Sequence, residues 1–430
     1  MPTRSSFLKR LLAAFAVLFA AALVLAYFLF EPLFLWPFGW KPLPPETTLT
    51  LGERKVYKPE FVRQATLAQP LLERVQKELG APAVSVAVGV DGVLVWAESR
   101  GLADVDARTP AKLDTRFRIG STSKAVTGTA MAKLVEAGKL DLDAPIARYA
   151  TYFPQSAFPV STRQVLSHTA GFRDYKECFC FPVWEYQSTK QFDSIEAALQ
   201  AFAKEPLEAV PGERFKYSSP GFNVAGAVAE GASGKPFPVF LTETLLTPLS
   251  MRDTSPDYRD RDVPNRAHFY HVKDGSYREA YAVNNSNKWP AGGLVSTPSD
   301  LVRMTNALLV DAYLKPEVRA QLFTPQKLKD GTNNPQGYAL GWRSQTREMF
   351  RKTQSLKVVH HGGVALGSSS FLLLFPEQKV TVSIVMNLDS EGHFKLHEAA
   401  YAIAEIFLLD RVEQVVPVVP QSSGGSKGSL

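Results

Sequence analysis

Strand-like segments lie near both ends of this chain and the region between them is helical, which restricts the folds open to it. Two β-rich runs, at residues 83–90 and 93–98, are separated by an Asp-Gly pair, the strongest short signal for a hairpin. Two more runs, at 369–375 and 380–386, are joined by a short turn. We therefore predict an α+β fold. One antiparallel sheet is built from both chain ends and flanked by helices, with an all-helical insertion subdomain between them.

Three helices are predicted from the spacing of apolar residues. Residues 61–79 form an amphipathic pattern that ends at Gly80. Residues 121–137 place apolar side chains at helical spacing before Gly138, and a last helix is predicted over 392–409. These helices supply faces that can cover the sheet.

An uninterrupted apolar run occupies residues 11–30. Twenty residues at 1.5 Å each span about 30 Å, the hydrocarbon thickness of a bilayer. Arg4, Lys9 and Arg10 precede the run and place the N-terminus in the cytoplasm. We predict a cytoplasmic tip and transmembrane anchor at 1–36, in a single-pass protein of the cytoplasmic (inner) membrane with its main domain exported. A cleaved signal is the alternative, because alanines within the run offer a cleavage site.

The remaining chain divides by composition. Residues 37–60 are rich in proline and predict a semi-extended linker, 61–412 form one folded domain, and 413–430 predict a flexible Gly/Ser-rich tail. The formal net charge of +6 is scattered over 430 residues rather than gathered in blocks. This suits a protein near an anionic membrane and argues against a nucleic-acid partner.

Ser121 and Lys124 stand three residues apart at the predicted start of the helix over 121–137. Residues at i and i+3 are neighbours on a helix, so the lysine amine can reach the serine hydroxyl and act as its base. Lys124 lies in an otherwise apolar stretch, and burial favours the neutral amine that a base requires. The pattern alone also fits an N-cap serine followed by a surface lysine.

Five segments resemble, in order, motifs of the serine β-lactamase and penicillin-binding-protein superfamily. They are FRIGSTSK at 117–124, VLSHTAGF at 165–172, PGERFKYSS at 211–219, WPAGGLVST at 289–297, and HHGG at 360–363 followed by GSS at 367–369. The chain is most similar to the branch of class C enzymes, esterases and D-aminopeptidases, and particularly to the mitochondrial β-lactamase-like serine protease group.

The resemblance implies roles for particular residues. Ser121 would attack the substrate carbonyl and form an acyl-enzyme, and Lys124 would take its proton. Tyr217 would relay a proton to the leaving group; a lid whose hydroxyl makes only a local hydrogen bond is the alternative. The backbone N–H groups of Ser121 and Gly363 would form the oxyanion hole.

Two positions depart from the family pattern. Ser219 stands where the tyrosine motif usually has asparagine, and its shorter hydroxyl leaves a substrate-binding role open. His360 stands where penicillin-recognising members carry lysine. Because histidine is mostly neutral at pH 7, we expect weak binding of anionic penicillins and an activity that changes through about pH 6–7. We expect His360 and Gly362 to contact substrate, and the side chain of His361 to point to the opposite face.

The other histidines and the two cysteines have simpler readings. His168 is expected to hold backbone by hydrogen bonds, and His393 and His397 to lie on a solvated helix face rather than bind metal. Cys178 and Cys180 are too close for an unstrained bridge; they are read as small hydrophobic residues, with pairing between chains as the alternative. We expect no metal and no cofactor.

The sequence therefore predicts a serine acyl hydrolase that acts on an ester, amide or peptide bond in a small-molecule or peptide substrate. A cell-wall D,D-peptidase or true β-lactamase is the alternative within the enzyme class. A catalytically silent binding or assembly module is the alternative of another class, because fold does not guarantee chemistry. Members of the mitochondrial group assemble, but nothing in the sequence demands an oligomer.

Overall fold

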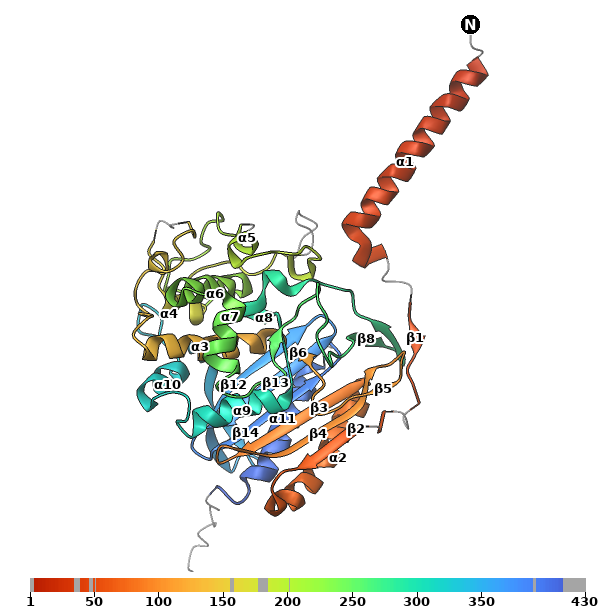
Figure 1. Cartoon of the computed structure of the whole chain (residues 1–430). Helices are drawn as coiled ribbons and strands as arrows, with labels where there is room; N and C mark the ends of the chain where they lie inside the picture. The colour runs from red at the N-terminus through yellow and green to blue at the C-terminus, as the bar shows by residue number, and fades with distance from the viewer. Residues whose placement is uncertain are drawn as a thin grey trace, which may run out of the picture.

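The fold is taken from a computed structural model of the chain (Figure 1). It describes residues 4–34, 39–45, 49–50, 52–154, 158–176, 185–200, 202–389 and 392–412, without the side chains of 4–7 and 27–34. Cys178, Cys180 and the predicted tail at 413–430 lie outside the described residues.

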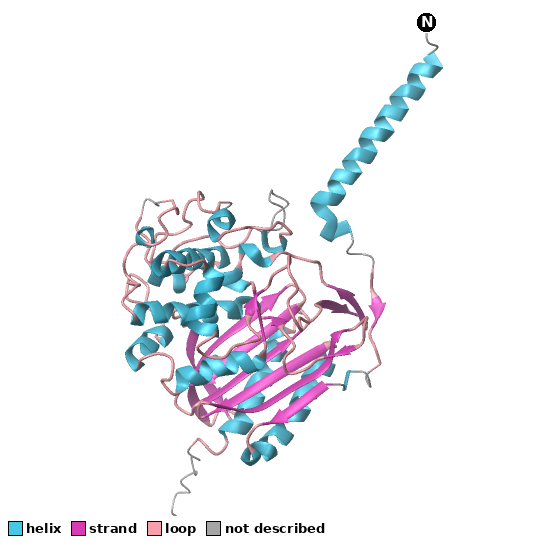
Figure 2. Cartoon of the chain, viewed as in Figure 1, coloured by secondary structure: helices cyan, strands magenta, loops and turns pink. Residues whose placement is uncertain are grey.

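The main sheet is antiparallel and joins the two ends of the domain, as predicted (Figure 2). Its strands follow the order β11, β12, β13, β14, β3, β4, β2, with β5 paired to β4. The bounds are β2 Gly52–Val56, β3 Ala83–Val90, β4 Val93–Asp104, β5 Thr109–Pro110, β11 Arg343–Met349, β12 Gln354–Ala365, β13 Ser368–Phe375 and β14 Val380–Met386. The predicted pairs at 83–98 and 369–386 form the centre of this sheet.

Helices cover both faces of the sheet (Figure 1). On one face, α2 (Val62–Leu79) and α11 (His393–Leu408) pack apolar side chains against the strands, in a cluster that includes Leu72, Phe371 and Ile403. On the other face lie the helices that carry or follow the predicted motifs. They are α3 Ser123–Glu136, α4 Thr162–Leu166, α6 Ser219–Ser233, α8 Trp289–Gly292 and α9 Pro298–Leu309, with α5 Ile195–Leu199, α7 Phe237–Leu241 and α10 Pro316–Phe323 further out.

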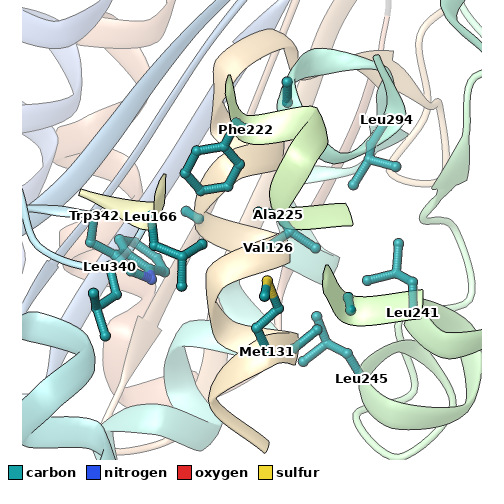
Figure 3. Packing of buried hydrophobic residues seen from close by; sticks show 14 of the residues in the cluster. Val126, Met131, Leu166, Phe222, Ala225, Leu241, Leu245, Leu294, Leu340 and Trp342 are labelled. Atoms are coloured by element: carbon teal, nitrogen blue, oxygen red, sulfur yellow. The ribbon is translucent and has the colours of Figure 1, made fainter. Parts of the chain in front are cut away.

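The α3 helix is the centre of the second core (Figure 3). Val126 and Met131 lie against apolar residues of neighbouring segments, among them Phe222 of α6 and Trp342. A helix surrounded in this way is buried on nearly all sides, which explains the apolar stretch around Lys124. Burial of α3 fixes the position of the turn that precedes it.

The insertion is not all helical, which corrects the prediction. Short strands β6 (Phe117–Arg118), β7 (Ser255–Pro256) and β10 (Leu294–Ser296) form one small sheet. A second small sheet contains β1 (Lys41–Pro42), β8 (Tyr270–Lys273) and β9 (Ser276–Glu279). The pairings of β6, β7 and β10 and of β1 with β9 join residues far apart in sequence, so hydrophobic periodicity does not reveal them; β8 and β9 form a local hairpin.

Two strands fall within the segment predicted to be a linker. The strand β2 adds to the edge of the main sheet beside β4, and β1 pairs with β9. Lys41 Nζ also lies 2.7 Å from Asp106 Oδ1. Much of 37–60 is therefore folded onto the domain rather than extended away from it.

The N-terminal helix α1 (Arg4–Phe34) stands apart from the domain in Figure 1. Its stretch Leu8–Ala26 has a mean hydropathy of 2.2 over 19 residues and is not buried against the rest of the chain. By length and composition this helix can cross a membrane, and a signal sequence has the same properties.

Candidate active site

Ser121 lies in the short 3-10 turn η3 (Gly120–Thr122), between β6 and α3. Gly120 has a φ of +48°, and a Cβ there would lie 2.5 Å from Val364 O. Glycine therefore allows this turn to approach β12 closely. Thr122 Oγ1 meets Ser370 Oγ of β13 at 2.8 Å, which ties the turn to the sheet. These contacts hold the Ser121 hydroxyl between α3 and the edge of the sheet.

Lys124 is fully buried, and its amine makes three hydrogen bonds. Nζ lies 3.2 Å from Ser121 Oγ, 3.1 Å from Ser219 Oγ and 2.7 Å from Ala291 O. The carbonyl of Ala291 only accepts hydrogen bonds, and Ser219 can also accept one. A neutral amine can donate to these two groups and still direct its lone pair at the hydroxyl of Ser121. The arrangement fits a base aimed at the serine.

The ring of Tyr217 lies beside this amine, with its centroid 4.8 Å from Lys124 Nζ. The loop that carries Tyr217 is fixed by His168, whose Nδ1 accepts from the backbone N–H of Ser218 at 3.1 Å. Lys216 donates its backbone N–H to His168 O at 2.7 Å, and the rings of His168 and Tyr217 are 4.2 Å apart. The expectation that His168 holds backbone is confirmed.

Ser219 is the first residue of α6, and Ser218 caps that helix by accepting from the N–H of Gly221. The backbone N–H of Ser219 donates to Asp174 Oδ1 at 2.9 Å. The Ser219 hydroxyl thus reaches Lys124, although the serine side chain is shorter than the asparagine side chain of the family pattern.

The two histidines of the third motif lie on opposite faces of β12, as predicted. The faces are exchanged, however: the prediction placed His360 on the side of Ser121. His360 pairs with Leu373, which belongs to the core on the α11 face, and its ring lies 5.5 Å from Phe371. His361 pairs with Leu372, which belongs to the core around α3. Directly opposite residues share a face, so His361, rather than His360, faces the Ser121 side. The predicted substrate contact of His360 is therefore not supported.

His361 is fully buried and joins the aromatic cluster next to Tyr217. Its Nδ1 lies 2.7 Å from the carbonyl of Gly362 and must donate, so its Nε2 accepts from the hydroxyl of Tyr338 at 2.8 Å. Burial, and then the charges of Arg343 and Lys124, hold the pKa of His361 well below its usual value. This histidine is neutral.

The backbone of β12 shows which N–H groups face Ser121. Only Leu366 and Gly367 separate β12 from β13, so Ala365 and Ser368 form a hydrogen-bonded pair across the hairpin. Hydrogen-bonded pairs alternate along an antiparallel ladder. The N–H of Gly363 therefore points at β13, and the N–H and C=O of Val364 point to the free edge.

Gly363 has a different function in the packing. A Cβ there would lie 2.7 Å from Ser370 Oγ, 2.8 Å from Thr122 N and closer still to Ile119 O. The absence of a side chain lets β12 touch the turn that carries Ser121. At Gly362 the Cβ would instead meet the imidazole of His397 on the α11 face, so the structure does not support its predicted contact with substrate.

Several groups at the site were missed from the sequence. Tyr338 bonds His361, and the guanidinium of Arg343 lies 5.7 Å from the ring centroid of Tyr217. Tyr186 Oη donates to Val364 O at 3.4 Å. These residues lie outside the predicted motif positions, and only long-range contacts bring them to Ser121.

No cluster of metal-ligating side chains occurs among the residues that the structure describes. His393 and His397 have ring centroids 5.6 Å apart, and His397 stacks on Phe371 at 3.9 Å. His397 thus packs into the α11 face, which corrects the prediction that it is solvated; burial lowers its pKa to about 3.

Comparison with known proteins agrees with this geometry. A protein-family model described as Beta-lactamase matches residues 68–406. The chain belongs to the beta-lactamase family. It is 31% identical over 448 residues to the human mitochondrial serine beta-lactamase-like protein LACTB, covering 82% of this chain and 81% of that protein. The resemblance inferred from the motifs is confirmed, and with it membership of a family of serine hydrolases.

Solved structures share the fold of this chain. The D-amino acid amidase from Ochrobactrum anthropi SV3, complexed with D-phenylalanine, has a TM-score of 0.67 at 23% identity, covering 81% of this chain and 100% of that one. The octameric penicillin-binding protein homologue from Pyrococcus abyssi has a TM-score of 0.65 at 22% identity, covering 80% and 77%. The predicted α+β fold class is thus confirmed, apart from the all-helical insertion.

Proposed function

We propose that this beta-lactamase family member hydrolyses an ester, amide or peptide bond through an acyl-enzyme on Ser121. The observation that carries the proposal is the buried amine of Lys124, 3.2 Å from Ser121 Oγ and held by two further oxygens. The amine takes the hydroxyl proton as Oγ bonds to the substrate carbonyl carbon. Tyr217, next to Lys124, passes a proton to the leaving group. Water then releases the acid from Ser121.

The negative charge that develops on the carbonyl oxygen needs donors beside Ser121. We assign these donors to the backbone N–H groups of Ser121 and Val364. Val364 replaces the predicted Gly363, whose N–H faces β13 in the alternating ladder. The contact of Gly120 with Val364 supports this choice, because it brings the two N–H groups to one place.

The reason for expecting poor turnover of anionic penicillins rested on a histidine in contact with substrate. His360 faces α11, and the Arg343 guanidinium lies beside Tyr217, so that reason no longer holds. Turnover should therefore be measured with p-nitrophenyl esters, D-amino acid amides and nitrocefin together. Hydrolysis of an ester or amide that is lost in Ser121→Ala supports the proposal. No Ser121-dependent turnover across the panel would favour a silent module.

We also propose that α1 stays uncleaved and anchors the domain on the outer side of the cytoplasmic membrane. Its length and hydropathy, and the basic residues before it, support this placement. Carbonate-washed membranes should retain the full-length chain, and protease added to spheroplasts should degrade the domain. A shortened chain in the soluble fraction would contradict the anchor.

A further inference from the structure

A short segment crosses the free edge of β12 next to Ser121. Residues Glu185–Gln187 form a single 3-10 turn, which we call the strap. From the strap, Tyr186 Oη donates to the carbonyl oxygen of Val364 at 3.4 Å. Val364 is also the residue to which we assign an oxyanion donor, so the strap touches the proposed substrate-binding edge.

The carbonyl of Val364 can accept a hydrogen bond from the backbone of an extended substrate. The ladder between β11 and β12 ends at the pair of Arg343 and His360, so Val364 lies beyond the last pair. Opposite residues of a hydrogen-bonded antiparallel pair exchange both N–H···O bonds. A substrate residue whose carbonyl accepts from the N–H of Val364 therefore presents its own N–H to Val364 O. Tyr186 Oη already donates to that oxygen, so a substrate N–H must compete with it.

Side chains from two other segments of the chain hold the strap in place. The amine of Lys288 donates to Tyr186 O and lies 4.1 Å from the centroid of its ring. Asn287 Nδ2 donates to Glu185 O at 3.1 Å, and Arg173 forms an ion pair with the Glu185 carboxylate at 2.8 Å. Lys288 is 5% exposed, so this contact is shielded from water. A cation over an aromatic face is worth more when desolvated.

Lys288 also connects the strap to the catalytic groups. It directly precedes α8, and Ala291 of that helix accepts the hydrogen bond from Lys124. Lys288 thus lies between the strap and the helix that holds the amine of Lys124.

We propose that Tyr186 is a specificity-determining residue: held by Lys288, it occupies the carbonyl of Val364 and disfavours acyl groups that carry an amide N–H next to the attacked carbonyl. Lys288 is a positioning residue, because it acts through Tyr186. The inference rests on the proposed function. It predicts that acyl groups without this N–H are preferred to peptide acyl groups, which carry it.

The strap contact should depend on pH. Burial, and then the charge of Arg118, lower the pKa of Lys288 to about 7, although Asp257 raises it. Below pH 7 the ammonium group attracts the ring of Tyr186, and above pH 7 the neutral amine does not. Discrimination against amide N–H groups should therefore weaken as the pH rises through 7. Among the described residues, the charged groups around this contact are Arg118, Asp257 with Arg266, Asp389 near Tyr186, and the ion pair of Arg173 and Glu185 on the strap.

A matched pair of substrates tests the inference. The p-nitrophenyl esters of N-acetylglycine and of levulinic acid share a leaving group and differ by NH in place of CH2. The ratio of their kcat/KM values cancels effects on Ser121 and Lys124. Tyr186→Phe should raise the N-acetylglycine-to-levulinate ratio about two- to tenfold, the range a net hydrogen bond between neutral groups is worth. Tyr175→Phe, which alters the tyrosine packed 5.5 Å from Tyr186, should leave the ratio unchanged.

Variants of Lys288 supply a second, independent readout. In the wild type the ratio should rise between pH 6 and pH 8. Lys288→Met should raise it at pH 6 and abolish the change with pH, and Lys288→Arg should keep it low at both values. If Tyr186→Phe hydrolyses both esters with the wild-type ratio, the inference about Tyr186 is wrong, while the proposed function still stands. No Ser121-dependent turnover of either ester would overturn the proposed function and this inference with it.

Discussion

Replacing Gly363 with alanine should damage catalysis far more than the same change one residue earlier. The new Cβ would lie 2.7 Å from Ser370 Oγ and closer still to Ile119 O, whereas ordinary contact begins at 3.4 Å. These separations fall short of ordinary contact by 0.7 Å or more (3.4 − 2.7), so either β12 or the turn that carries Ser121 must move. A displacement of about 1 Å costs on the order of 100-fold in rate. Overpacking should also destabilise the domain by about 1–3 kcal/mol.

The control is Gly362→Ala, whose Cβ would meet the His397 imidazole at 2.9 Å on the other face of the strand. That imidazole is the end of a side chain and can rotate, so kcat/KM should fall less than about tenfold. The assay is hydrolysis of p-nitrophenyl acetate, with thermal unfolding of each variant. Equal activity losses in the two variants, or wild-type activity in Gly363→Ala, would show that the close contact between β12 and the Ser121 turn is wrong.

Three further predictions follow from individual contacts. Lys124→Met should lower kcat/KM about 10²–10⁴-fold and destabilise the domain by about 1–3 kcal/mol, because the buried carbonyl of Ala291 loses its Lys124 donor; a kcat/KM loss below tenfold would refute the role of Lys124 as base. Burial lowers the pKa of His360 to about 3, so, contrary to the prediction from sequence, His360→Gln should leave the shape of the pH–rate profile unchanged from pH 5.5 to 8. Burial by itself raises the pKa of Asp257, but Arg118 and Arg266 hold it below its usual value. Its carboxylate therefore stabilises the fold above about pH 4 and loses this effect as the pH falls. Asp257→Asn should cost about 3–5 kcal/mol in urea unfolding at pH 7 and less at pH 3; an equal loss at both would contradict the pairing.

The parts of the fold that depend on local pattern could be predicted from the sequence. The hairpin around the Asp-Gly pair at 91–92 and the helix at 62–79 needed only turn chemistry and apolar periodicity. Ser121 and Lys124 could be paired because helical spacing alone places i and i+3 together.

The sequence could not establish on which face of the sheet each side chain of β12 lies. Side chains alternate with a period of two, so an error of one residue exchanges His360 with His361 and Gly362 with Gly363. Only the pairing of β12 with β13 fixes which histidine faces Tyr338. Tyr186 and Lys288 were missed for a related reason, because their contacts join loops about a hundred residues apart.

The central claim is that the buried amine of Lys124 activates the hydroxyl of Ser121. The most direct measurement is labelling with a fluorophosphonate, followed by mass spectrometry of the modified peptide and the rate of labelling. We expect one adduct, on residue 121, which is absent in Ser121→Ala and forms at least 100-fold more slowly in Lys124→Met. An adduct on another residue, or equal labelling rates in the wild type and Lys124→Met, would contradict the claim.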